Sequence, residues 1–138
     1  VATIGTLGIK YNNKIIKTNL TSPDTITLHK NLDFLKRKKI DNVIIEASSH
    51  GLSQKRLHHI KIKAGIFTNF SQDHLDYHKT MKSYLNAKLL LFREILEKKA
   101  SIILDRDIKQ YSLIKKIAKN KKLKVLEISE ELKKIGDL

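Results

Sequence analysis

Residues 42–51 read NVIIEASSHG, and this stretch contains the pattern that decides the fold. Its first part, residues 42–47, is short, rich in β-branched residues and almost continuously apolar, which predicts a strand buried on both faces of a parallel sheet. Its second part is small and polar and ends in a glycine, as is typical of a turn from a strand into a helix. Glu46 stands where the two parts meet. A carboxylate there is costly to bury unless it is paired or binds a metal, although Glu46 could equally mark the exposed tip of the strand.

Strands and helices alternate on both sides of this stretch. Asn12 and Asn13 favour the left-handed turn of a small hairpin over residues 9–17. In the segment that follows, Ser22 is the expected helix cap, with Pro23 and Asp24 in the first turn. The further strands that we expect are residues 1–4, 64–69, 100–104 and 123–128, and the further helices are residues 80–96, residues 107–119 and a last helix capped by Ser129.

This order of elements predicts the α/β class, with a mainly parallel sheet flanked by helices in a single domain. In such sheets, ligands bind beyond the carboxyl ends of the strands. Polar residues lie at or just beyond that end of several expected strands, namely Thr6, Glu46, Asn69 and Asp105. The sequence therefore places a candidate site at this edge of the sheet.

The 138-residue chain carries a formal net charge of +14, which is compatible with nucleic acid, anionic membranes or anionic substrates. The lysines are spread over faces that water would solvate in any case, and aromatic residues make up only 6% of the chain. We therefore expect no nucleic acid and no membrane as a partner, and keep a basic module that binds polyanions as the alternative. There is no cysteine and no apolar run of about 20 residues, so we expect a cytoplasmic protein without disulfides.

A second polar stretch, TNFSQDHLDYH over residues 68–78, holds two aspartates and two histidines directly after an apolar run. Asp73, His74, Asp76 and His78 could together bind a divalent ion, or Asp73 could simply cap a turn. His74 and His78 are four positions apart, as in zinc-binding helices, but HLDYH lacks the glutamate of HExxH. A zinc hydrolase is therefore a minor alternative.

Lys88 lies on the apolar stripe of its expected helix, together with Tyr84, Leu85 and Phe92. A lysine on a stripe that faces the core must reach water with its head group, shift its pKa or find an anionic partner. Reaching water is the usual outcome. The functional alternative is a neutral amine that reacts covalently, for example with carbon dioxide to give a carbamate.

Five segments, in this order and at these spacings, resemble the central ATPase domain of the Mur ligase family: IGTLG, TSPD, EASSHGLSQKR, FTNFSQDHLDYHKTM and YLNAKLLLF. The resemblance covers residues 4–92 and is strongest to the branch that makes the tripeptide precursor of peptidoglycan. It implies a fold similar to that of P-loop NTPases. The GxxGK[ST] phosphate loop of the family is not among the 138 residues. We therefore expect residues 1–138 to be a partial central domain, incomplete at its N-terminus, that needs the rest of its own polypeptide and is inactive alone.

The resemblance also implies a reaction. ATP would phosphorylate the γ-carboxylate of UDP-N-acetylmuramoyl-L-alanyl-D-glutamate, and the amine of a diamino acid would then attack the acyl phosphate. The expected diamino acid is meso-diaminopimelate, or else L-lysine. Mg²⁺ is the expected cofactor, because the reaction gathers many negative charges.

Residue roles follow from the same resemblance, position by position. Glu46 and His74 match magnesium ligands of the family, and Lys88 matches a lysine that family members carry as a carbamate, whose oxygens help to hold the metal. Five further residues match positions that contact the UDP-muramoyl-dipeptide: Thr21, Ser22, Ser48, Gln54 and Arg56.

Overall fold

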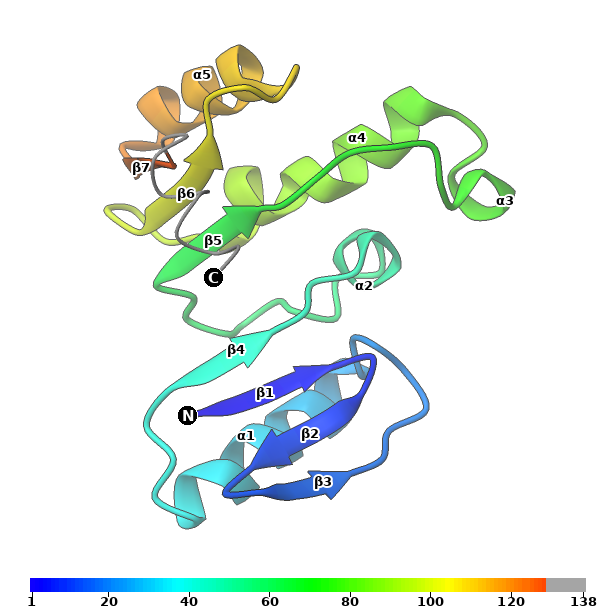
Figure 1. The fold of residues 1–138 in the computed structure, drawn as a ribbon, viewed down its shortest axis with the longest axis vertical. Coiled ribbons are helices and arrows are strands. Elements are labelled where there is room, and N and C mark those ends of the chain that lie inside the picture. The colour runs from blue at the N-terminus through cyan, green and yellow to red at the C-terminus, as the bar shows by residue number, and fades with distance from the viewer. Residues whose placement is uncertain (129–138) are drawn as a thin grey trace, which may run out of the picture. The chain divides into compact units, whose positions relative to one another are not determined.

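The computed structural model describes residues 1–128, which fall into two compact units, one over residues 1–59 and one over the described residues from Ile60 onward. Each unit has its own sheet and its own helices, and each is described here by itself (Figure 1). The expected last helix from Ser129 lies outside the described residues. Among the described residues, no helix is long and apolar enough to cross a membrane.

The first unit is built on a four-stranded sheet in the order β3-β2-β1-β4. Its strands are β1 (Ala2–Gly5), β2 (Gly8–Tyr11), β3 (Lys14–Ile16) and β4 (Val43–Ile45). The β2–β3 hairpin confirms the prediction, because Asn12 and Asn13 have φ angles of 44° and 61°. A second hairpin, between β1 and β2, was not predicted, and it makes this sheet mixed: only β4 runs parallel to β1.

Helix α1 (Thr25–Arg37) begins two residues later than the sequence suggests. Its cap is Asp24, whose carboxylate accepts a hydrogen bond from the Thr27 N–H at 3.0 Å, so the prediction that Ser22 is the cap was wrong. The physical reason is that the Ser22 hydroxyl is already used elsewhere, donating to the Glu46 carbonyl at 2.8 Å. A short helix, α2 (Ser49–Ser53), follows β4 and is capped by Ser48.

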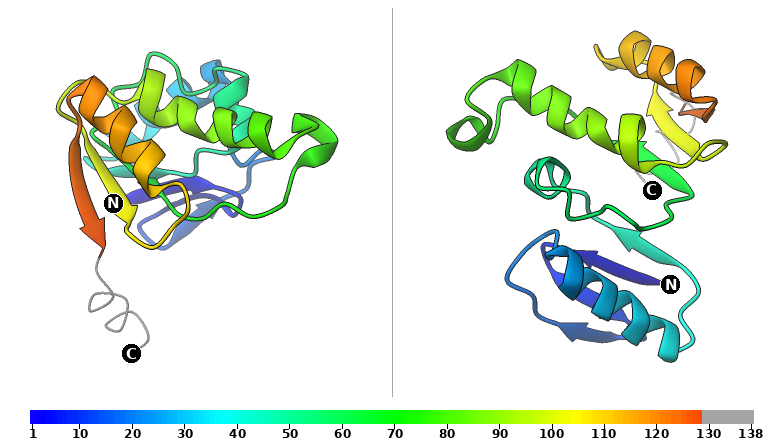
Figure 2. Two further views of the ribbon diagram at one scale, coloured as in Figure 1. Left: turned by 90° about the horizontal axis from the view of Figure 1, so that it is seen from above. Right: turned by 180° about the vertical axis from the view of Figure 1, so that it is seen from behind.

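The core of the first unit lies between its sheet and α1, as the view from behind shows (Figure 2). Leu28 and Leu35 of α1 are fully buried together with Ile4 of β1. On the other face of the sheet, Ile44 is 61% exposed. The prediction that β4 is buried on both faces was therefore wrong in the part of the chain that the structure describes. In this unit α1 covers one face only, and alternate side chains of β4 point away from it.

The second unit contains a three-stranded, fully parallel sheet in the order β5-β6-β7, as predicted for this part of the chain. The strands are β5 (Ala64–Phe67), β6 (Ser101–Asp105) and β7 (Lys124–Ile128), and the helices are α3 (Leu75–His78), α4 (Met81–Leu90), the π-helical turn η1 (Leu91–Ile95) and α5 (Tyr111–Lys121). Helices α4 and α5 lie on the same face of this sheet (Figure 1). The helix predicted over residues 80–96 is thus found, but its last turn is π-helical.

Close packing of η1 on the sheet depends on Gly65 in β5. A Cβ atom there would lie 3.2 Å from side-chain atoms of Phe92 and Leu96, which is tighter than ordinary contact. Phe92 is 1% exposed, and its ring centre lies 6.2 Å from that of Phe67. This contact holds η1 against β5.

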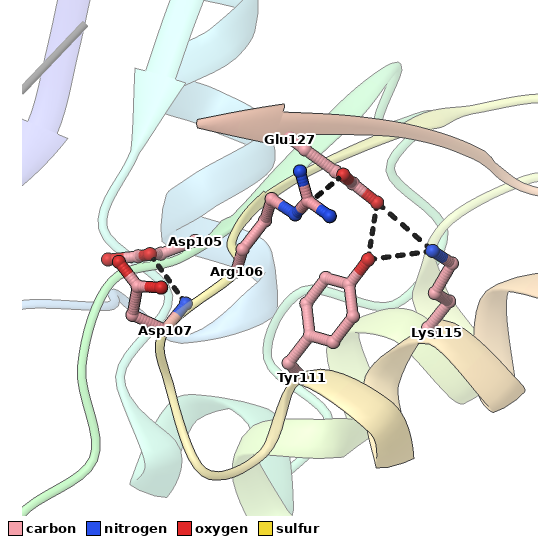
Figure 3. Close-up of polar contacts among 6 residues, drawn as sticks. All are labelled: Asp105, Arg106, Asp107, Tyr111, Lys115 and Glu127. Atoms are coloured by element: carbon pink, nitrogen blue, oxygen red, sulfur yellow. Dashed lines mark hydrogen bonds and ion pairs between the residues drawn. The ribbon is translucent and has the colours of Figure 1, made fainter. Parts of the chain in front are cut away.

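A polar network joins the start of α5 to β7 (Figure 3). Glu127 accepts a hydrogen bond from the Tyr111 hydroxyl and pairs with Lys115 at 3.1 Å and with Arg106 at 3.3 Å. The hydrogen bonds from Tyr111 and Lys115 lower the pKa of Glu127. The network therefore holds the loop after β6 against the neighbouring strand.

Candidate functional site

The Glu46 carboxylate lies directly beyond β4 in the first unit. The backbone N–H of Thr6, just after β1, donates to Oε2 at 2.8 Å, and the Thr6 hydroxyl donates to the same oxygen at 3.0 Å. That hydroxyl also lies 3.0 Å from the Thr21 hydroxyl. Gly5 leaves room for the arrangement, because a Cβ atom there would lie 2.5 Å from Oε2. The carboxylate is thus held in one place at the carboxyl ends of two parallel neighbouring strands.

Four of the residues expected to contact the substrate form one cluster in the same unit. The Ser22 hydroxyl lies 3.0 Å from the Ser48 hydroxyl and accepts from the Ser48 N–H at 3.0 Å. Arg56 donates to the Ser22 carbonyl at 2.7 Å and to the Gln54 side chain at 2.5 Å. Ser22 is fully buried, so in this structure its hydroxyl supports the cluster from within.

In the second unit, His74 lies where the chain enters α3. It has a left-handed backbone with φ of 54°, and its N–H donates to its neighbour Asp73 at 2.7 Å. Its imidazole Nε2 lies 3.5 Å from the Asp73 carboxylate. His78, at the end of α3, is 8% exposed and stacks on the ring of Tyr84 with centres 5.3 Å apart. Because His74 precedes the helix, the two histidines are not two positions on one helical face.

Lys88 is half-buried on α4, as the apolar stripe indicated. Its amine donates to the Asn69 carbonyl, just beyond β5, at 2.7 Å. The amine also lies over two aromatic faces, 5.2 Å from the centre of Phe67 and 5.6 Å from that of Tyr84. Burial lowers the pKa of Lys88, which raises the fraction of neutral amine at a given pH.

The structure therefore brings the predicted residues together in two groups, one in each unit. Glu46 and Thr21 meet through Thr6, and His74 and Lys88 both contact Tyr84. The convergence of Glu46 with His74 and Lys88 stays a prediction. Within residues 1–128, no three side chains of His, Cys, Asp or Glu gather in a group that could hold a metal ion.

Tyr84 was missed as a member of the site, whereas Thr6 was placed at the candidate edge of the sheet but was given no role there. Thr6 carries a signal in the sequence, since it follows the expected first strand directly, as Glu46 ends the strand that pairs with it. Tyr84 has no such signal, because an aromatic residue on an apolar stripe most often belongs to the core.

The model of the Mur ligase middle domain matches residues 1–137, almost the whole chain. The chain belongs to the Mur ligase family. Among solved structures, it is similar to one of UDP-N-acetylmuramoyl-L-alanyl-D-glutamate--2,6-diaminopimelate ligase, with a TM-score of 0.78 and 32% identity over 91% of this chain.

Curated relatives carry the same ligase name. The Bradyrhizobium diazoefficiens enzyme is 43% identical over 106 residues, which cover 77% of this chain and 22% of the relative. The Zymomonas mobilis enzyme is 40% identical over 134 residues, covering 97% of this chain and 28% of the relative. This Mur ligase chain thus spans about a quarter of the length of these relatives, and matches the same share, 25%, of the solved structure.

Proposed function

We propose that the polypeptide containing this chain is an ATP-dependent ligase of peptidoglycan synthesis. It joins a diamino acid, meso-diaminopimelate in the first place and L-lysine as the alternative, to UDP-N-acetylmuramoyl-L-alanyl-D-glutamate. The observation that carries the proposal is the family match over residues 1–137, together with relatives at 40% identity or more that are named for the diaminopimelate reaction.

Of the three proposed metal ligands, the Glu46 carboxylate suits Mg²⁺ best. The Glu46 carboxylate offers the oxygen ligands that Mg²⁺ prefers, and its hydrogen bonds to Thr6 fix its orientation. The His74 imidazole would be a second ligand and the Lys88 carbamate a third. When bound, ATP would activate the substrate carboxylate by phosphorylating it, and Mg²⁺ would neutralise the phosphate charge.

The environment of Lys88 suits carbamate formation. Attack on carbon dioxide needs a neutral amine, and burial lowers the pKa of Lys88. The ammonium group first gives one proton to water. The nitrogen lone pair of the neutral amine then forms a bond to carbon, one C=O electron pair moves to oxygen, and the nitrogen gives a second proton to water. A cation facing the core becomes an anion that a metal ion can balance.

The Ser22 cluster would serve the UDP-muramoyl-dipeptide. Arg56 presents a planar fork of donors suited to a carboxylate or phosphate, and the Ser22 carbonyl and Gln54 hold that fork in place. Thr21 and Ser48 would add hydroxyl contacts. Ser22 is proposed as a substrate-binding residue because it matches such a position in the family. Since Ser22 is fully buried, it would act chiefly by holding Ser48 and Arg56 in place.

The test is a ligation assay on the complete polypeptide with UDP-N-acetylmuramoyl-L-alanyl-D-glutamate, ATP and Mg²⁺. We expect phosphate release that depends on meso-diaminopimelate and exceeds the rate with L-lysine. Lys88→Arg keeps a positive charge but cannot form a carbamate at neutral pH, so we expect a loss of at least about 100-fold in kcat.

Lys82→Arg is the matched control, because Lys82 lies exposed on the same helix, and it should retain full activity. The chemical readout is a carbamate signal in the ¹³C spectrum after labelling with ¹³C-bicarbonate, present in the parent protein and absent in Lys88→Arg. Phosphate release that ignores every diamino acid would refute the proposed function.

A further inference from the structure

Four side chains of the second unit contact one buried ring, that of Tyr84 in α4, which is 7% exposed. The ring of Phe70 lies 5.2 Å away, measured between centres, and that of His78 is stacked at 5.3 Å. His74 meets Tyr84 nearly at right angles, with centres 5.6 Å apart and 86° between planes. The Lys88 amine lies over the ring at 5.6 Å. A single side chain therefore contacts both proposed metal-binding residues of this unit.

His74 lies at the start of a short segment. Helix α3 is only four residues long, and both of its flanking residues, His74 and Lys79, have positive φ angles, which are uncommon for residues other than glycine. By contrast, Tyr84 stands on a regular helix that is capped by Thr80. The Tyr84 ring therefore stands on the longer and more regular of the two helices, and its contacts with His74 and His78 connect α3 to α4.

Lys88 is one helical turn after Tyr84, so both side chains leave α4 on the same side. Before it is carbamylated, the charged amine is drawn to the faces of Tyr84 and Phe67 by attraction between a cation and aromatic rings, and the Asn69 carbonyl fixes its direction. Aromatic rings are rigid and have few rotamers. Contacts of His74 and Lys88 with the same rigid ring set the spacing between them.

We propose that Tyr84 is a positioning residue, whose ring sets the spacing of the His74 imidazole and the unmodified Lys88 amine, and so places the carbamate that forms on this amine beside His74 for metal binding. The inference rests on the ligase function proposed above and adds a residue to it. Tyr84 touches the two side chains and acts through them. The contacts are made by the ring, so phenylalanine should replace tyrosine, whereas leucine should not.

The test compares Tyr84→Leu and Tyr84→Phe in the complete polypeptide, using Mg²⁺ itself as the probe. Metal binding is followed by the imidazole NMR signals of His74 and by the Mg²⁺ concentration that half-saturates ligation. Loss of a partner that orients a metal ligand weakens metal binding about 10-fold or more, and this is the effect expected for Tyr84→Leu. Tyr84→Phe should stay within about twofold of the parent protein.

Phe92→Leu is the control for a general loss of stability. Phe92 is a fully buried ring of the same unit, and it packs on Phe67. It should lower the melting temperature as Tyr84→Leu does while leaving the Mg²⁺ response unchanged. An equal Mg²⁺ response in Tyr84→Leu and the parent protein would overturn the proposal.

A second measurement applies even if Tyr84→Leu does not fold. In the parent protein, nuclear Overhauser contacts should join the Tyr84 ring to the His74 ring and to the Lys88 ε-methylene, with and without Mg²⁺. Their absence overturns the positioning role. Their presence in a protein that shows no ligation leaves the positioning role standing and removes the proposed reaction, so the two failures can be told apart.

Discussion

Gly5 is the residue on which the position of the Glu46 carboxylate depends most directly. A Cβ atom at Gly5 would lie 2.5 Å from Oε2 and 3.0 Å from the Cβ of Glu46. Gly5→Ala should therefore push the carboxylate away from Thr6. We expect a loss of about 10-fold in ligation by the complete polypeptide, recovered in part by raised Mg²⁺, with little change in melting temperature.

Gly65→Ala is the matched control, because it adds the same methyl group in the second unit. There the new atom meets Phe92 and Leu96 of the core at 3.2 Å, so it should cost about 1–3 kcal/mol of stability and leave the response to Mg²⁺ unchanged. If Gly5→Ala has full activity at low Mg²⁺, Glu46 is not held where the metal needs it.

Single residues were predictable where their chemistry conflicts with their surroundings. Lys88 on an apolar stripe and Glu46 at the end of an apolar run both stand out in the sequence. Lys88 is half-buried, as its stripe indicates, whereas Glu46 is exposed, which is the second of the two alternatives left open for it. Ser22 did not stand out as a buried anchor, because a serine before Pro23 and Asp24 looks like a helix cap. Its partners, Glu46 and Ser48, are more than 20 positions away, and contacts at that separation leave no local pattern.

At the scale of elements, α1 depends on its cap. The Asp24 carboxylate accepts from the Thr27 N–H, which is one of the unpaired donors of the first turn, and hydrogen bonds from Thr27 lower the pKa of Asp24. Asp24→Ala should lower the melting temperature by a few degrees at pH 7. Asp24→Asn, which still offers an oxygen, should lose much less.

The pH dependence of this effect has a definite sign. Because the pKa of Asp24 is lower in the folded state, its charge stabilises the fold above the unfolded pKa of about 3.9, and this contribution disappears as the pH falls through the folded pKa. The difference in melting temperature between the parent protein and Asp24→Ala should therefore narrow below about pH 4. A difference that is constant from pH 7 to pH 3 would show that the charge has no part in the cap.

The elements themselves were largely predictable because the periodicity is strong. The apolar runs at β4, β5 and β6 and the Asn12–Asn13 turn gave the strands and one hairpin, and the stripe through Tyr84 and Phe92 gave the long helix. The sequence does not predict the β1–β2 hairpin, because Gly5 marks the end of what looks like an isolated strand. The turn of this hairpin depends on Gly8, whose φ angle is 90°. Gly8 also lies so close to the Ile16 carbonyl that no side chain would fit there.

At the scale of the whole molecule, the net charge of +14 allows association with any polyanion at low salt. If charge alone drives it, affinity for duplex DNA should fall about 10³-fold or more between 50 and 200 mM salt, because each neutralised phosphate releases counterions. Glu46→Gln and His74→Ala should leave this binding unchanged, since neither side chain is a lysine or arginine that meets phosphate. Fluorescence anisotropy with labelled DNA over a salt series measures both effects.

Glu46→Gln and His74→Ala should abolish ligation by the complete polypeptide. Loss of ligation with unchanged DNA binding would distinguish the proposed ligase from the alternative, a basic module that binds polyanions. A ligase whose substrates are a UDP-sugar and ATP gains from a positive field that draws anions to it, without needing tight binding to any polymer. Binding to DNA that survives 200 mM salt and depends on base sequence would require contacts to bases beyond charge, and would favour the polyanion-binding module instead. With aromatic residues at only 6% of the chain, stacking on exposed bases has few side chains to use, so we expect the steep salt dependence.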